Sequence, residues 1–463
     1  MPSLLRRHRR AGLIGGVTVL AVSVASLSLS ALTPAVASAS NPGNNIVIAS
    51  GSQTAYALVA GFDDLFNSSQ GCDEIANTGE TQALNFNCPS GTNITTTDNQ
   101  LVNDTGENPS NDVIVQEPPL GGTNGLKQLE GATPVLCVPS NATCTASAPI
   151  NFATTVRNPL PTDPIGLNFV NYAQDAISWF HFKEVNGVNT PSAKVTNLTV
   201  PDLENIWDGT YTNWKQIPGA KGTSGSICVY VTNTGSGLYS LWQTYLGIPA
   251  LNSYVNSNPS LPGCDDAGET YAVSHTIEQN EDGATISNGD EANAIFFYSY
   301  GRYEQQCKTG LKVCGGTKVG GTGTSTTALG EIDSTALTPA NILSGAWPTR
   351  VFLSNVYSDG AGSYPVASQA ALNYVSEFGF LCNPQKSGGS DIIDPATGIW
   401  YRTEIQNLIA AEDFEALPLG AEGAVPTPAD LLSPYNQAGQ TSGGSAGSTD
   451  PQGYCLVSST DGN

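Results

Sequence analysis

The segment ICVYVTNTGSGLYSLWQTYL, residues 227–246, joins three local patterns. An apolar, β-branched run over residues 227–231 comes first and favours a strand. A turn rich in Gly, Ser and Thr follows over residues 232–237. The apolar side chains after the turn recur at helical spacing: Leu238, Leu241, Trp242 and Tyr245. The segment therefore predicts a strand, a tight turn and an amphipathic helix in direct succession.

The same succession occurs twice more, nearer the N-terminus. Residues 46–49 form a short apolar run that leads through the turn GSQT, residues 51–54, into an amphipathic stretch. Residues 113–115 lead through two prolines to GGTNG, residues 121–125, and to a second predicted helix. Repeated strand–turn–helix units are typical of proteins with largely parallel sheets. We therefore predict the α/β class.

Two further elements have clear local signals. The segment YAQDAISWFHF, residues 172–182, is aromatic and β-rich, which predicts a strand. Thr199 precedes Pro201 and Asp202, which gives a hydroxyl cap, a proline at a first helical position and an acid in the first turn. This pattern predicts a helix that begins beside residue 200.

The first 39 residues have the pattern of a secretory signal peptide. Four arginines, at positions 6, 7, 9 and 10, precede an apolar stretch over residues 11–32, and small residues then offer cleavage after Ala37 or Ala39. A transmembrane anchor is the alternative, but Gly, Ser and Thr dilute the apolar run. The first cysteine is Cys72, so no lipid-anchor cysteine follows the signal. We expect a secreted protein without a membrane anchor, extracellular or associated with the cell wall.

Charge and length limit the possible functions. The chain has 40 acidic residues against 17 Lys and Arg, and loss of the four signal arginines makes the net charge still more negative. Such a balance argues against nucleic acid and anionic membrane surfaces as partners. About 425 residues remain after the signal. A chain of this length is usually too long to fold around a single hydrophobic core. Two domains are therefore expected.

All ten cysteines lie beyond the signal and none forms a C-x-x-C motif. This favours disulfides in an oxidising compartment over zinc or thioredoxin chemistry. Proximity along the chain predicts five pairs: Cys72–Cys88, Cys137–Cys144, Cys228–Cys264, Cys307–Cys314 and Cys382–Cys455.

Catalytic patterns are scarce. The three histidines, His8, His181 and His275, have no metal-like spacing, and no G-x-S-x-G elbow occurs. A buried or surface role is the better interpretation of His181 and His275. The adjacent acids Asp63 and Asp64 lie early in a predicted helix, where acids are favoured in any case. We therefore predict no enzyme activity, no cofactor and no metal site.

The Gly/Ser/Thr turns carry more information, because each lies between a strand and a helix. The first N–H groups of a helix lack partners inside the helix, and the helix dipole adds partial positive charge there, which favours anions. A tight βα connection without a ligand is the simpler alternative for any single turn. The negative net charge does not exclude an anionic ligand, because salt screens charges beyond roughly 8 Å.

Several segments resemble those of a known family. The residues Gly209, Thr212, Asn213 and Trp214 match a family segment in which a helix is followed by G-x-I-T-N-W. TNTGSGLYSLW resembles the family's phosphate loop, GSQTAY its first loop, and GGTNGLKQL the loop that opens a later helix. NAIFFYSYGRY and the Trp347-Pro348 stretch also stand where the family has comparable elements. Over about residues 46–420, the chain thus resembles the phosphate-binding (PstS-like) components of ABC importers.

The resemblance implies a set of ligand contacts. The arginine before the family's GSG loop is Thr232 here, the threonine after it is Leu238, and the ligand-binding aspartate has no clear match. FATTVRN, residues 152–158, stands near the aspartate's position, and its Arg157 is a substitute for the missing positive charge. Loss of the aspartate puts selectivity for phosphate over sulfate in question. The predicted contacts are Ser52, Thr54, Thr123, Asn124, Gly125, Thr155, Arg157, Gly235, Ser236 and Gly237.

The resemblance also implies the architecture and the function. The fold would be the type II periplasmic-binding-protein fold, with two lobes joined by two crossovers: residues 44–168 plus 348–463, and residues 170–346. The function would be capture of phosphate or a related oxyanion by a monomer, for uptake through an ABC permease. The alternatives are a secreted structural or adhesive protein that keeps the fold without a ligand, and a phosphatase-like enzyme, which the scarcity of catalytic patterns disfavours.

Overall fold

The structure is a computed structural model of the chain. The residues that it describes are 47–68, 114–116, 121–131, 150–157, 159–160, 162–232, 234–251, 264, 276–277, 286, 289–308, 315–317, 324–360, 364, 366–367, 369–376, 379–382, 384, 393–394, 397–417 and 455–459. Within these ranges, no helix has the length and hydropathy of a transmembrane span.

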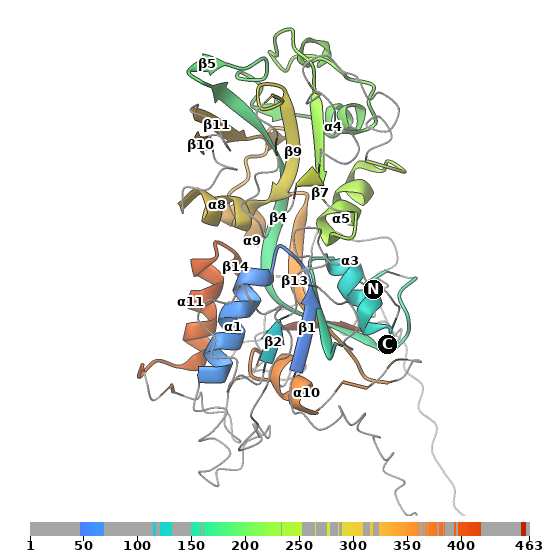
Figure 1. Ribbon diagram of the computed structural model, residues 1–463, viewed down its shortest axis with the longest axis vertical. Helices are drawn as coiled ribbons and strands as arrows, with labels where there is room; N and C mark the ends of the chain where they lie inside the picture. The colour runs from blue at the N-terminus through green and yellow to red at the C-terminus, as the bar shows by residue number, and fades with distance from the viewer. Residues whose placement is uncertain are drawn as a thin grey trace, which may run out of the picture. The chain divides into compact units, whose positions relative to one another are not determined.

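Strands and helices alternate through much of the chain (Figure 1). The strands are β1 Val47–Gly51, β2 Ile114–Gln116, β3 Phe152–Thr155, β4 Leu167–Val185, β5 Val188–Asn189, β6 Asn197–Leu198, β7 Cys228–Thr232, β8 Thr276–Ile277, β9 Ala294–Ser299, β10 Gly315–Thr317, β11 Thr324–Leu329, β12 Glu331–Ile332, β13 Arg350–Ser358, β14 Glu415–Ala416 and β15 Leu456–Ser459. The helices are α1 Tyr56–Ser68, α3 Gly122–Leu129, α4 Val200–Trp207, α5 Gly237–Leu246, α8 Tyr300–Lys308, α9 Pro339–Leu343, α10 Gln369–Val375 and α11 Tyr401–Ala411, with a short 3-10 turn, η2, at Trp214–Gln216.

Most of these strands form one mixed sheet, in the order β2-β1-β3-β13-β4-β9-β7-β8. The neighbours β2, β1 and β3 are parallel, as are β9, β7 and β8, whereas the central pairs β3–β13, β13–β4 and β4–β9 are antiparallel. Three of these parallel strands, β1, β2 and β7, come from the strand–turn–helix units predicted from the sequence. The predicted α/β class is therefore confirmed.

The long strand β4 links the two ends of this sheet. Its first half pairs with β13, which lies beside it in Figure 1, as far as Ala176 opposite Arg350. From Ile177 onward it pairs with β9, and later with β11. Trp347 donates its indole N–H to the Ile177 carbonyl at 2.9 Å, beside the change of partner. The strand predicted over residues 172–182 is thus confirmed within a longer one.

The predicted division into lobes stays a prediction. Its boundary near residue 169 falls inside β4, so the chain crosses it in a continuous strand and not in a linker. The core is also continuous, because one cluster of buried side chains includes residues of α1, β4, α5 and α11. Aromatic pairs recur in it, such as Phe62 with Tyr172 and Trp207 with Trp242, with ring centroids 5.5 and 5.4 Å apart.

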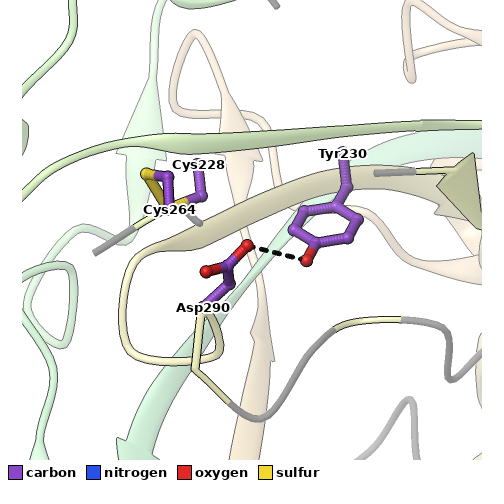
Figure 2. The surroundings of a disulfide bond; sticks show 4 residues. All are labelled: Cys228, Tyr230, Cys264 and Asp290. Carbon is purple, nitrogen blue, oxygen red and sulfur yellow. Dashed lines mark hydrogen bonds between the residues drawn. A yellow bond between two sulfur atoms is a disulfide. The ribbon is translucent and has the colours of Figure 1, made fainter. Parts of the chain in front are cut away.

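Two of the five predicted disulfides are present among the described cysteines. Cys228 of β7 bonds to Cys264, next to the hydrogen bond from the Tyr230 hydroxyl to Asp290 (Figure 2). Cys382, after α10, bonds to Cys455, just before β15. Cys307 is also disulfide-bonded, but its predicted partner Cys314 lies outside the described residues. The pairs Cys72–Cys88 and Cys137–Cys144 lie wholly outside them.

Candidate functional site

The turn after β1 is fixed by the neighbouring strand β3. The Ser52 N–H donates to the Thr154 hydroxyl at 2.7 Å and to its carbonyl at 3.0 Å, and the Ser52 hydroxyl accepts the Ala55 N–H. Gly51 has a φ of 143°, and a Cβ there would lie 2.1 Å from the Thr154 carbonyl oxygen. Ser52 and Thr54 are both buried at the start of α1, where the sequence predicted them.

The turn before α3 has no side-chain cap. Gly121, with a φ of 91°, precedes the helix without a side-chain cap, and the first turn holds no acid. The Thr123 N–H donates to the Gly235 carbonyl at 3.0 Å. The Thr123 hydroxyl oxygen is buried and has no hydrogen-bond partner within the part of the chain that the structure describes. No side chain of the N-cap residue therefore caps this helix start.

The turn before α5 is capped differently. The hydroxyl of Ser236 accepts the Leu238 N–H at 3.2 Å, which leaves its own O–H as a donor. Gly237 opens the helix, and a Cβ there would lie 2.8 Å from a methyl group of Val156. The predicted strand–turn–helix unit is confirmed here, with β7 ending at Thr232 and α5 beginning at Gly237.

The end of β3 lies between these two helix starts. A Cβ on Gly122 would lie 2.6 Å from the Thr155 hydroxyl oxygen, and one on Gly237 would lie 3.5 Å from it. This hydroxyl accepts the Arg157 N–H at 3.2 Å. Thr155 is fully buried, so its side chain helps to space α3 from α5.

The guanidinium of Arg157 does not offer a free positive charge. It donates twice to the Asp163 carboxylate, at 2.7 Å each, and both side chains are almost fully buried. It also lies over the Phe169 ring, 5.8 Å from the centroid. A bidentate pair of this kind neutralises both charges locally. That Arg157 replaces the missing charge stays a prediction, and in the structure its guanidinium is paired with Asp163.

The structure brings the predicted contacts together. Three close approaches connect their segments: Thr123 with Gly235, Gly122 with Thr155, and Gly125 with β1, where a Cβ would lie 2.6 Å from Gly51 Cα. Asn124 lies against Gly235, since a Cβ on Gly235 would be 2.2 Å from the side-chain amide nitrogen of Asn124. That these residues hold a ligand stays a prediction.

Sequence reasoning missed two polar side chains beside this cluster. Ser354 of β13 lies opposite Thr155 on one side and opposite Asn171 of β4 on the other. Directly opposed residues share a face of the sheet, and the Ser354 hydroxyl hydrogen-bonds the Asn171 side chain. All three are buried. No sequence signal marks them, because Ser354 follows Asn171 by more than 180 residues.

Two buried ionisable groups lie elsewhere on β4. Asp175 accepts the Gly301 N–H at 2.9 Å and the Ser299 hydroxyl, at the start of α8. Burial raises the pKa of Asp175 to about 6, despite these hydrogen bonds. Burial lowers the pKa of His181 to about 4, while its Nδ1 hydrogen-bonds the Ser192 hydroxyl at 2.9 Å. His181, for which a buried or surface role was predicted, is buried, and His275 lies outside the described residues.

Among the residues with described positions, no group of His, Cys, Asp and Glu is arranged to hold a metal ion.

Comparisons with known proteins identify a domain. Residues 165–377 match the model of the PBP superfamily domain, so the predicted likeness to binding proteins is confirmed at this level. Similar solved structures include a putative phosphate ABC transporter substrate-binding protein with bound phosphate from Clostridium perfringens, with 16% identity, a TM-score of 0.41, and coverage of 80% of this chain and 99% of that one.

Two other similar solved structures are a phosphate transport receptor and a PstS protein. An ABC-type phosphate transport receptor from Vibrio cholerae is 15% identical, with a TM-score of 0.38, over 80% of this chain and 100% of that one. PstS from Borrelia burgdorferi is 14% identical, with a TM-score of 0.34, over 81% and 99%. No curated protein matches the chain significantly.

Proposed function

We propose that this chain, whose residues 165–377 form a PBP superfamily domain, is an extracytoplasmic solute-binding protein. It captures phosphate or a related oxyanion without chemical change and delivers it to an ABC permease. The ligand would lie between two lobes joined by β4 and β13. Disulfides in the described part support an oxidising compartment, and the predicted signal peptide supports secretion.

One observation carries the proposal: the N-termini of α3 and α5 meet. The Thr123 N–H at the start of α3 reaches the carbonyl of Gly235, two residues before α5 begins. Each helix start has partial positive charge, equivalent to roughly half an elementary charge. Two positive ends at close range favour an anion that contacts both.

Apart from Arg157, whose charge is paired with Asp163, the donors proposed for this anion are neutral. Since Asp163 neutralises Arg157, binding rests on backbone N–H groups and on the hydroxyls of Thr123 and Ser236. The set of ten proposed contacts contains no carboxylate that could accept the proton of hydrogen phosphate. We therefore expect the chain to distinguish poorly between phosphate and sulfate.

A thermal-shift screen tests the function directly. Phosphate, sulfate, molybdate and a phosphonate are added to the folded protein, and the melting temperature is recorded. A ligand at 100 times its dissociation constant stabilises the native state by about 2.7 kcal/mol, which is readily detected. No shift with any of these anions would favour the structural or adhesive alternative.

Substitutions at the start of α5 then test the site. Ser236→Ala removes the O–H donor and should weaken phosphate binding roughly ten- to a hundred-fold, because hydrogen bonds to charged groups contribute about 1.5–3 kcal/mol. Gly237→Val should be worse, since its side chain would meet Val156. Ser240→Ala, one turn further along α5, is the control and should bind normally. Equal affinities for wild type and Ser236→Ala would exclude the proposed contact.

A further inference from the structure

The contact between the α3 and α5 turns depends on two glycines. A Cβ on Gly121 would lie 2.4 Å from the Gly235 carbonyl oxygen, 2.5 Å from its carbon and 2.8 Å from the Ser236 nitrogen. All three are backbone atoms, which no side-chain rotation can move away. A Cβ on Gly235 would instead meet the Asn124 amide at 2.2 Å. The turns therefore approach closely only because both positions lack side chains.

These turns belong to opposite ends of the sheet order. The helix α3 packs on β1 and β3, whereas α5 follows β7, which lies beyond β13, β4 and β9. The backbone bond from Thr123 to Gly235 thus bridges elements that the strand ladder keeps apart. A contact of this kind fixes the distance between the two helix starts, which neither end of the sheet fixes alone.

The same bond offsets an electrostatic cost. The positive ends of α3 and α5 repel each other when they are close. The Gly235 carbonyl oxygen, which has partial negative charge, lies at the start of α3 and partly offsets this repulsion. The two ion pairs described, Arg157–Asp163 and Arg302–Glu412, do not join these turns.

We propose that Gly121 and Gly235 are positioning residues that hold the α3 and α5 helix starts together before a ligand arrives. The assignment of the ligand as an oxyanion rests on the proposed function, whereas the loop contact itself does not. The turns are then ordered during folding, so ligand binding does not include the conformational entropy cost of ordering them. Opening the contact should therefore weaken anion binding without removing any ligand-contacting side chain.

The test compares Gly121→Ala with Gly131→Ala. Both glycines have positive φ, 91° and 77°, a backbone conformation that L side chains rarely adopt. Among the described residues, only Gly121 lies against the α5 turn, since a Cβ on Gly131 would meet no described atom within 4 Å. Gly131→Ala is therefore the control for a positive-φ substitution at the opposite end of α3.

The first readout is hydrogen exchange of the Thr123 amide in the ligand-free protein. An N–H in the first turn of a helix has no partner inside the helix, so its protection reports the bond to Gly235. We expect exchange at least ten-fold faster in Gly121→Ala than in wild type or Gly131→Ala. Equal exchange rates in the two variants would overturn the proposal.

The second readout is the affinity for inorganic phosphate, measured by calorimetry. We expect it to fall at least ten-fold in Gly121→Ala and to stay unchanged in Gly131→Ala. Faster exchange with unchanged affinity would also overturn the positioning role. If wild type binds no phosphate while Gly121→Ala still exchanges faster, the loop contact is supported and the proposed function fails.

A second variant covers the case in which Gly121→Ala does not fold. Gly235 is not at positive φ, and Gly235→Ala adds a methyl group that meets only the end of the Asn124 side chain. It should fold and should speed the exchange of the Thr123 amide in the same direction, with a smaller size. Wild-type exchange in this variant would count against the proposal.

Discussion

The starts of α8 and α3 differ in where their negative charge comes from. At α8, Asp175 places a buried carboxylate against the Gly301 N–H, and the Ser299 hydroxyl accepts the Arg302 N–H at 3.1 Å. At α3, no side chain caps the helix and the first turn holds no acid. The start of α8 thus contacts a carboxylate of the chain, whereas the start of α3 contacts the backbone carbonyl of Gly235.

The comparison extends to α4, whose N-terminus is also capped by side chains of the chain itself. Thr199 and Asp202 form a reciprocal capping box there, so α4 resembles α8. A helix start that already holds a carboxylate repels a second anion, whereas one without a carboxylate does not. Among the described helix starts without an acid in the first turn, α3 and α5 are the ones joined by a backbone hydrogen bond, and substitutions can convert one kind of start into the other.

The largest expected effect comes from giving α3 an acid of its own. Asn124→Asp places a carboxylate in the first turn, where Asn124 already faces Gly235. Two like charges about 4 Å apart repel by about 4 kcal/mol at an effective dielectric constant of about 20. Phosphate affinity, measured by calorimetry, should therefore fall on the order of a thousand-fold, although the helix itself gains up to about 1 kcal/mol.

Asn124→Leu is the control for shape, because it removes the amide without adding charge. It should weaken binding far less than Asn124→Asp. If the two variants bind phosphate equally, the charge at this helix start is irrelevant to the site.

An intermediate effect is expected from Asp175→Asn, in the pH dependence of stability. The native pKa of Asp175, about 6, lies above its usual value, so the native state binds this proton more tightly than the unfolded state does. Its contribution to stability is therefore largest at low pH and is lost as pH rises through 6. Between pH 7 and pH 4, wild type should gain about 2 kcal/mol from this group, and Asp175→Asn should not.

His181 has the opposite effect over the same range. Its native pKa, about 4, lies below the usual value, so its contribution is complete above pH 6.5 and is lost as pH falls toward 4. Without Asp175 to oppose it, this loss should appear as acid sensitivity in Asp175→Asn. Urea unfolding at several pH values measures the effect, and parallel profiles for wild type and variant would contradict it.

The smallest effect is expected at α4. Thr199→Ala removes the cap and should reduce the free energy of unfolding by about 1 kcal/mol. Phosphate affinity should not change, since α4 already has its own acid. A loss of affinity comparable with that of Ser236→Ala would show that general helix stability, and not the α5 turn, controls binding.

Local patterns were predictable from the sequence, and distant pairings were not. The cap at Thr199, the start of α5 at Gly237 and the Cys228–Cys264 bond each follow from neighbouring residues or nearby spacing. Asp175 meets Gly301 across 126 residues, and only the pairing of β4 with β9 brings them together. No periodicity in either segment indicates that partner.

The site divides in the same way. The three turns were found because each has a composition of its own, whereas the role of Gly121 depends on an α5 turn more than 100 residues away. The ion pair of Arg157 was missed for a different reason. Its carboxylate partner lies only six residues ahead, but in an irregular segment whose spacing indicates no contact.

The Cys382–Cys455 bond determines what a protease can detach from this molecule. It spans 73 residues and holds the terminal strand β15, which pairs with β4 from Asn168 to Asn171. A single cut anywhere between the two cysteines leaves both fragments joined through sulfur, and only cleavage combined with reduction separates them. Nicking there would therefore be invisible on a non-reducing gel, and the nicked chain would keep β15 tethered beside the polar side chain of Asn171.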